Sequence, residues 1–194
     1  MSNLFQQLEQ EAFRAGITPR SKQSIRWFRN KLSTIKSVNR QAIMREDPIT
    51  KMKANSGMVG SMFMYFYDPK LKKTLPYYDR FPLTVIVGPA EGGFYGINLH
   101  YLPMTLRAKF LDSLMERTSN KKFDETTTFK FLSSASKNKY FKPCFKHYLT
   151  RHVQGQVALV PAPEWEIATF LPTAQFKKEN ENKIWSDSRK KING

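Results

Sequence analysis

The chain has 194 residues, a formal net charge of +16 at pH 7, 40% hydrophobic residues and 13% aromatic residues. This length is typical of one domain, and the apolar content excludes a wholly disordered chain because it can offset the entropy of ordering. No apolar run approaches the ~20 residues that cross a bilayer, no signal peptide is expected, and the single cysteine, Cys144, excludes an internal disulfide.

Two amphipathic helices are predicted near the N-terminus. Apolar side chains recur every four positions through residues 3–16, and Gly16 suits the helix end. A second helical pattern follows Thr18-Pro19, with apolar residues at spacings of three and four and a basic opposite face. Residues 37–60 show no sustained period and contain Pro48, Gly57 and Gly60, so an extended linker is predicted there.

The central part of the chain favours short strands. Residues 61–68 are apolar at successive positions, which predicts a strand covered on both faces. Residues 81–88 and 93–102 predict a hairpin joined by a short glycine turn, and residues 156–160 predict a fourth strand. The 68–80 connection contains two prolines and predicts a fixed loop.

Helical patterns fill the rest of the chain. Helices are predicted for residues 103–117 and 142–153, each with a proline near its start, and for the end of 161–171. Residues 118–138 predict a polar loop with a short helix. The expected fold is α+β, with a small, strongly bent antiparallel sheet or partly open β-barrel, inserted helices and an N-terminal helical arm. The predicted units are a basic helical arm and linker (1–60), a compact core (61–176) and a basic C-terminal tail (177–194).

Positive charge is concentrated in the N-terminal part. Between Arg14 and Lys53, eleven Lys or Arg residues stand against only Glu46 and Asp47. Such a segment attracts nucleic acid, acidic protein surfaces or anionic lipid, and charge alone does not select among them. A solvated helix face is the simpler interpretation, although the cations lack acidic i, i+4 partners. The predicted polyanion or subunit contacts are Arg20, Lys22, Arg26, Arg29, Lys31, Lys36 and Arg40.

Residues 64–87 interleave aromatic and basic residues, a pattern typical both of base-stacking surfaces and of a barrel core. The aromatics before Asp68 fall in the strand predicted to be covered, and the lysines cluster in the loop, so core is favoured. The predicted core residues are Tyr65, Tyr67, Phe81 and Tyr101. The predicted loop contacts are Lys70, Lys72, Lys73, Tyr77, Tyr78 and Asp79, the last three forming an exposed contact at the loop end. Trp185, Arg189 and Lys190 are predicted to anchor the tail.

Catalytic and metal-binding patterns are weak. The GGFYG stretch at 92–96 lacks a phosphate-loop ending and leads into a strand, so a hairpin turn is favoured. Cys144, His147 and His152 could be metal ligands, but a fourth ligand at zinc-site spacing is absent, and no nucleophile elbow is present. We therefore expect no enzyme, no catalytic residue, no metal and no cofactor. A metal-dependent nuclease using Asp68 or Asp79 is the least favoured alternative.

Four stretches carry a resemblance: FYDPKLKKTLPYYDRFPL, GFYGINLHYLP, EWEIATFLPTAQF and IWSDSRKK. Over roughly residues 62–190 the chain resembles small basic virion or assembly proteins of large tailed bacteriophages, particularly contractile-tailed ones, in which an LPYYD loop precedes an NLHYLP strand end. The resemblance does not extend to residues 1–60, whose role follows from charge only.

The resemblance implies a structural component of a phage virion, in the tail, baseplate or head–tail connector region, with basic arms on neighbouring subunits. It implies other virion proteins as partners, in multiple copies of a symmetric particle assembled in the host cytoplasm. The alternative is a sequence-independent DNA-binding accessory protein that protects or packages DNA ends, whose affinity falls steeply with salt. Neither function requires a membrane or a small-molecule substrate.

Overall fold

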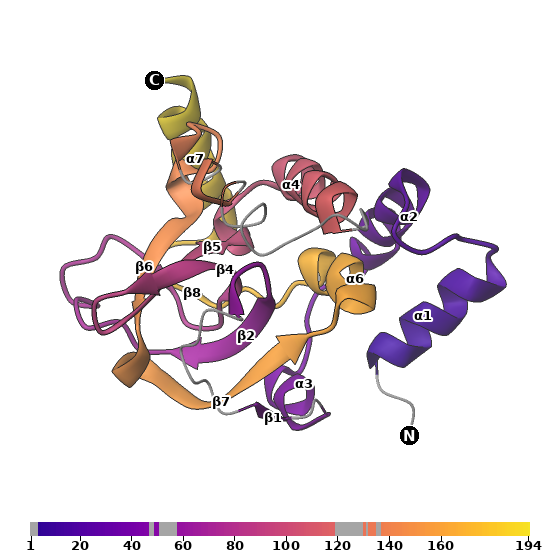
Figure 1. Ribbon diagram of the computed structural model, residues 1–194, viewed down its shortest axis with the longest axis horizontal. Coiled ribbons are helices and arrows are strands. Elements are labelled where there is room, and N and C mark those ends of the chain that lie inside the picture. Colours follow the sequence, from indigo (N-terminus) through magenta and orange to yellow (C-terminus); the bar gives the residue numbers. More distant parts are fainter. Residues whose placement is uncertain (1–3, 47–48, 51–57, 119–129, 131, 135–136) are drawn as a thin grey trace.

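The computed structural model describes residues 4–46, 49–50, 58–118, 130, 132–134 and 137–194. Helices pack beside an antiparallel sheet that is not closed, so the predicted α+β fold is confirmed (Figure 1). The described α-helices are α1 (Leu4–Arg14), α2 (Lys22–Leu32), α3 (Arg40–Glu46), α4 (Met104–Thr118), α6 (Trp165–Phe170) and α7 (Glu181–Asn193). Short 3₁₀ turns include η2 (Leu99–Tyr101) and η3 (Lys142–Cys144).

The main sheet has the strand order β1-β7-β2-β4-β5-β6, and every neighbouring pair is antiparallel. Its strands are β1 (Ile49–Thr50), β2 (Met62–Tyr67), β4 (Leu83–Ala90), β5 (Gly93–Asn98), β6 (Phe145–Leu149) and β7 (Val153–Val160). A second, small sheet pairs β3 (Tyr78–Asp79) with β8 (Phe176–Lys177). The four predicted strands are therefore confirmed, and the hairpin turn replaces any phosphate loop at residues 92–96.

The central strand β2 is buried on both faces, as its apolar sequence predicts. Met62 and Met64 belong to the main core, which also contains residues of α4 and α6. Phe63, Tyr65 and Tyr67 alternate with them and belong to a second cluster. The four predicted core aromatics are all buried, which confirms that they fill the interior instead of forming an exposed stacking surface.

The N-terminal helices contribute to the same main core. Helix α2 packs against α6 and α4, and its apolar face is buried at helical spacing. Ser21 caps α2 by accepting a hydrogen bond from the Ser24 backbone N–H at 3.0 Å. The Ser24 hydroxyl donates to the carboxylate of Glu166 in α6. The segment predicted as an arm thus holds helices that lie on the core through apolar and polar contacts.

Two segments form helices where the sequence predicted a linker and a polar tail. The linker prediction is wrong at residues 40–46, because Ile43 and Met44 are buried on one side of α3. In the C-terminal segment, Asn180 caps α7 by accepting a hydrogen bond from the Lys183 N–H at 2.9 Å. Ile184 and Ile192 are buried two turns apart on one face of α7. Residues 51–57 and most of 118–138 lie outside the described residues.

The helix predicted for residues 142–153 is wrong, because residues 145–149 form strand β6. β6 pairs with β5 in the register Gly93↔Leu149 to Ile97↔Phe145. Alternation along β6 places the rings of Phe145 and His147 against Tyr95, with centroids 5.3 and 5.2 Å apart. The intervening Lys146 and Tyr148 lie on the other face of the strand.

Gly93 permits the close pairing of β5 with β6. A Cβ atom at this position would overlap the backbone carbonyl of Tyr148. We expect Gly93→Ala to separate the two strands and to lower the melting temperature markedly, because the clash is with backbone that cannot move aside. The control is Gly155→Ala, where φ is +72° and the space is open. This control should lower the free energy of unfolding by only ~1 kcal/mol, the cost of placing alanine in a left-handed backbone conformation. Equal melting temperatures for the two variants would contradict the close approach.

Candidate functional site

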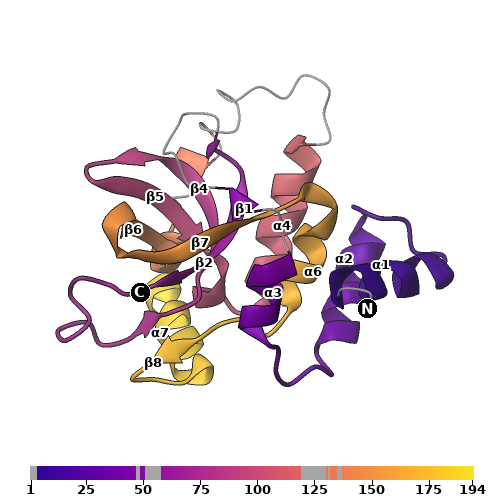
Figure 2. The ribbon, with the colours of Figure 1, turned by 90° about the horizontal axis from the view of Figure 1, so that it is seen from below.

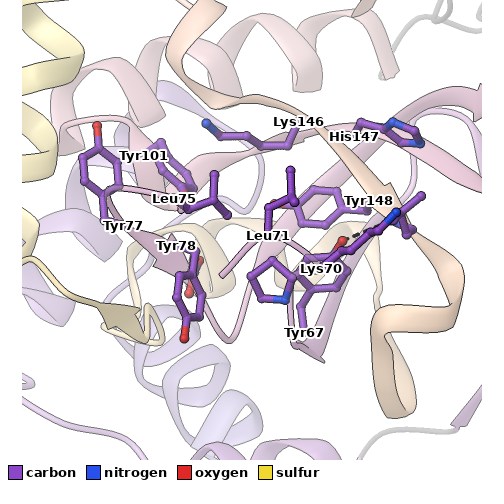
Figure 3. A pocket seen from close by; sticks show the side chains of 13 residues that line it. Tyr67, Lys70, Leu71, Leu75, Tyr77, Tyr78, Tyr101, Lys146, His147 and Tyr148 are labelled. Carbon is purple, nitrogen blue, oxygen red and sulfur yellow. Dashed lines mark hydrogen bonds between the residues drawn. The ribbon is translucent and has the colours of Figure 1, made fainter. Parts of the chain in front are cut away.

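A pocket of about 390 Å³ opens between the loop of residues 69–77, strand β3, η2 and strand β6. Figure 3 shows tyrosine rings gathered around Leu71 and Leu75, with Lys146 beside them. The lining residues come from five parts of the chain and are Tyr67, Pro69, Lys70, Leu71, Leu75, Tyr77, Tyr78, Asp79, Tyr101, Lys146, His147, Tyr148 and Leu149. The fold therefore brings the predicted LPYYD loop onto strand β6.

Aromatic rings form most of the pocket wall. The rings of Tyr67 and Tyr148 meet edge to face with centroids 4.9 Å apart. The Tyr67 hydroxyl accepts a hydrogen bond from the Leu149 backbone N–H at 3.1 Å, which joins the end of β2 to β6. Tyr77 and Tyr101 form a second pair at 6.1 Å. Leu71 lies at the pocket with 60% of its surface exposed, so an apolar side chain is presented to solvent beside these rings.

Lys146 supplies a positive charge inside the aromatic wall. Its Nζ atom lies 4.1 Å from the centroid of the Tyr101 ring, a cation–π contact. Among the described residues, no carboxylate forms an ion pair with it. Burial lowers the pKa of the Lys146 amine to about 8, and the nearby Lys191 acts in the same direction. An anion placed in the pocket would therefore meet an amine that has no acidic partner.

A buried polar network underlies the pocket and is centred on Asp79, which is only 3% exposed. One carboxylate oxygen of Asp79 lies 2.6 Å from Nδ1 of His100 and accepts a hydrogen bond from the Asn98 amide at 3.1 Å. The other oxygen accepts the backbone N–H groups of Phe81 and Gln175, both at 3.0 Å. The predicted exposed contact at Asp79 is thus wrong, because this residue joins the LPYYD and NLHYLP motifs inside the protein.

The pKa of Asp79 reflects two opposed effects. Burial by itself raises the pKa of a carboxylic acid, since it disfavours the charged form. The interaction with His100 and the two backbone N–H donors outweigh burial, and the pKa of Asp79 lies below its ordinary value. The ionised carboxylate is therefore the form that the folded state stabilises.

Asp79, His100 and Thr173 are hydrogen-bonded in the same order as the carboxylate, imidazole and hydroxyl groups of a hydrolase triad. Nε2 of His100 lies 3.0 Å from Oγ1 of Thr173. All three side chains are buried, and Thr173 exposes none of its surface. A substrate has no access to this hydroxyl, so the arrangement positions η2 and the segment after α6 and does not present a nucleophile.

Trp185 anchors α7 to the back of the pocket. Its indole N–H donates to the His100 carbonyl at 2.9 Å, and the Ser188 hydroxyl donates to the Tyr101 carbonyl at 2.8 Å. The buried guanidinium of Arg107 donates to the same His100 carbonyl at 3.0 Å and lies 5.4 Å from the Trp185 ring centroid. Trp185 therefore contacts its own chain, whereas the predicted Arg189 and Lys190 are exposed.

The 69–77 loop is held against the segment that leads into α7. Nζ of Lys178, just before α7, donates to the carbonyls of Lys73 and Leu75 in the 69–77 loop, at 2.9 and 2.6 Å. Lys72 pairs with Asp68 at 2.7 Å, whereas no ion pair of Lys70 or Lys73 is found within the described residues. We call this region, formed by the pocket, the 69–77 loop and α7, the pocket end.

The predicted N-terminal cations lie elsewhere. Figures 1 and 2 both place α2 far from α7 along the molecule. Lys22, Arg26 and Arg29 line a groove of about 280 Å³ with residues of α4. Lys31 pairs with Glu11 at 2.6 Å.

The other three predicted N-terminal cations differ in their contacts. Arg40 donates to the backbone carbonyls of Thr173 and Ala174, at 2.6 and 2.5 Å. Lys36 and Arg20 are exposed. The backbone N–H of Arg20, which has φ +59°, donates to Glu166 at 3.2 Å. The predicted set is therefore divided between surface charge and intrachain contacts.

Sequence reasoning missed Lys146 and Tyr148, because residues 142–153 were interpreted as a helix. The sequence FKHYL of residues 145–149 has no alternation of apolar and polar residues, so no local signal marks this strand. No cluster of three potential metal ligands occurs within the described residues. Cys144 is buried, and burial raises the pKa of its thiol to about 12.

Asp79→Ala tests the network. Loss of the carboxylate leaves His100, Asn98 and two backbone N–H groups without their acceptor, so we expect the free energy of unfolding to fall by about 3–5 kcal/mol. Chemical denaturation would measure this change. The control is Asp187→Ala, which removes an exposed i, i+4 partner of Lys183 and should have little effect. A similar small loss for both variants would contradict the central role of Asp79.

The same network predicts acid sensitivity. Because folding lowers the pKa of Asp79 below 3.8, its stabilisation is complete above the unfolded-state value and is lost as the pH falls through the lower folded-state value. The difference in unfolding free energy between wild type and Asp79→Ala should therefore shrink as the pH is lowered below 3.8. A difference that stays constant with pH would show that the carboxylate charge does not matter.

Comparison with known protein families matches residues 1–189 to the family described as phage T4 terminal DNA protecting protein. No curated protein and no solved structure matches the chain. No helix in the described part of the chain combines the length and apolar character that crossing a bilayer requires.

Proposed function

Because the chain belongs to the family of the phage T4 terminal DNA protecting protein, we propose that it binds the ends of phage DNA and shields them as a component of the phage particle. The family match over nearly the whole chain is the observation that carries this proposal. It favours the DNA-end alternative over the predicted role in a tail, baseplate or connector. No observation on the described residues supports that predicted role.

The charge of the chain supports a DNA partner. A net charge of +16 gives the protein a long-range attraction for a polyanion, and each phosphate contact adds affinity by releasing counterions. The exposed cations Lys70 and Lys73 lie in the 69–77 loop and Arg189 and Lys190 lie on α7, and none of them has an ion pair within the described residues. We assign the phosphate contacts to this pocket end.

The α2 face is the second basic surface, but part of its charge is already used. Lys31 is paired with Glu11, and Asp112 lines the groove beside Arg26 and Arg29. At the pocket end Lys72 and Lys183 are paired as well, but Lys70 and Lys146 lie beside aromatic rings, the combination by which proteins hold single-stranded nucleic acid.

Protection in this proposal is steric. A protein that covers a DNA end excludes an exonuclease without any reaction of its own, so no catalytic residue is needed. The buried position of Thr173 agrees with this, because the triad-like arrangement is closed to substrate. We therefore propose that the protein protects DNA ends without being an enzyme.

The first experiment compares a duplex that has free ends with a dumbbell duplex closed by a hairpin at each end. The purified full chain should bind the open duplex more tightly and slow its digestion by an exonuclease. The logarithm of affinity should fall by ~0.9 per phosphate contact for each tenfold rise in salt. Equal affinity for open and closed DNA, with no protection, would overturn the proposed function.

Two triple variants that lose the same charge test which surface contacts the DNA phosphates. The triple substitution Lys70→Gln, Lys73→Gln and Lys190→Gln removes three charges from the pocket end. We expect it to reduce the salt slope for the open duplex by about 2–3, because each lost phosphate contact removes ~0.9. The control substitution Lys22→Gln, Arg26→Gln and Arg29→Gln removes the same charge from α2 and should leave the slope unchanged. The reverse pattern would place DNA along α2.

A further inference from the structure

We propose that the pocket takes the terminal nucleotide of a DNA strand, with its base against the tyrosine rings and its phosphate beside Lys146. This inference rests on the proposed function and names the group by which an end is distinguished from the interior of a duplex. The pocket is formed by residues of the 69–77 loop, β3, η2 and β6, and no part of it belongs to the α2 face.

The size and lining of the pocket fit one nucleotide. A volume of about 390 Å³ lies at the lower end of the range for small-molecule sites and suits a ligand of the size of a single nucleotide. The partly exposed Tyr77 and Tyr78 offer rings at the end of the loop, and the apolar side chains of Leu71 and Leu75 face the same space. Tyr101 is buried beneath the Lys146 amine and completes the wall. Stacking of a base on an aromatic ring is tolerant of sequence, as a protein that acts on any end requires.

Charge at the pocket fits a phosphate group. Lys146 is half-buried with its amine over the Tyr101 ring and has no acidic partner among the described residues. Lys70 lines the same pocket from the exposed loop. Asp79, the acidic group of the lining, is already occupied by four hydrogen-bond donors and faces inward. An incoming phosphate would therefore meet two cations and no free carboxylate of the lining.

The geometry favours a terminal nucleotide over an internal one. A nucleotide enters such a pocket only after leaving the base stack, and unstacking costs least where the base is unpaired or at a frayed end. An internal nucleotide must also bring its neighbours on both sides toward the pocket, whereas a terminal nucleotide has only one neighbour. The shared chemistry is a nucleotide with its phosphate, and it can come from a 5′ or a 3′ end.

The test uses photo-crosslinking with the full chain. A hairpin duplex with one open end carries 5-iodouracil at the 5′ terminus, at the 3′ terminus or in the duplex interior, and peptides are mapped by mass spectrometry. We expect crosslinks from one terminal position to Tyr77 or Tyr78, and none of these from the interior position. The label position that crosslinks shows whether the pocket takes the 5′ or the 3′ end. Comparing hairpins that carry a 5′-phosphate or a 5′-hydroxyl shows whether the terminal phosphate contributes to binding.

Two pocket variants supply the energetic test. Lys146→Met keeps the length of the side chain and removes its charge, and Leu71→Glu places a carboxylate at an exposed position of the pocket. Each should weaken binding of the open-ended hairpin about tenfold or more, the size of one lost stacking or phosphate contact. Binding of the closed dumbbell should fall much less, because it has no end to place in the pocket and loses only general electrostatic attraction. Lys142→Met and Phe13→Glu are the matched controls, since both residues are exposed outside the pocket.

The outcomes separate the two proposals. Terminal crosslinks outside the pocket, or pocket variants that bind the open end like wild type, would overturn the pocket while protection of DNA ends still stands. Failure of the wild-type chain to prefer open over closed DNA would overturn the proposed function and the pocket together. Melting temperatures of all four variants close to that of wild type would show that altered binding is not a folding defect, and Leu71→Glu supplies the test if Lys146→Met unfolds.

Discussion

The buried carboxylate of Asp79 is the group on which the arrangement of the pocket depends. It accepts hydrogen bonds from Phe81 just before β4, from Asn98 in β5, from His100 in η2 and from Gln175 after α6. A carboxylate taken out of water is costly, and only a full set of partners offsets that cost. The four segments must therefore be in place at the same time. The 69–77 loop, which ends at β3, is positioned by this requirement and not by apolar packing alone.

A second polar junction holds the opposite side of the pocket. The His100 carbonyl accepts both the Trp185 indole N–H and the Arg107 guanidinium. These bonds join α7 and α4 to the short η2 turn that carries Tyr101. Because His100 contributes its ring to the Asp79 network and its carbonyl to this junction, the two sets of bonds are linked through one residue. A pocket formed in this way is ordered before any ligand arrives, so less ordering entropy opposes binding.

The sequence predicted the fold class and most elements, because periodicity was strong in those segments. Strand β2 was recognisable from its unbroken apolar run, and α1, α2 and α4 from apolar spacing. The failures have physical causes. At residues 142–153, a proline and apolar residues at helical spacing predict a helix. Pairing with the glycine-containing strand β5 determines the conformation there instead. Helix α3 has 7 residues, which is too short for a helical repeat of apolar positions to be recognised in the sequence.

The candidate site was predicted only in part. The loop lysines and tyrosines were singled out by composition, but their partners Lys146 and Tyr148 lie on a strand that no local pattern predicted. Asp79 was assigned to the surface because a charged residue beside two tyrosines at a loop end has no local feature that predicts burial. Its partners are 19 or more residues distant in the chain, except for Phe81, and only tertiary structure brings them together. Long-range polar networks of this kind have no periodic signature.

Net charge by itself does not account for the proposed recognition of a DNA end. A charge of +16 attracts the protein to DNA at any position, because phosphates are equally spaced along a duplex. Phosphate contacts position a protein but carry no information about where a strand stops. Part of the charge is also committed within the fold, at Lys31, Lys72 and Arg40. The proposed preference for an end therefore requires a group that only an end can satisfy, and the concave aromatic pocket with its unpaired lysine is the part of the described structure to which we assign it.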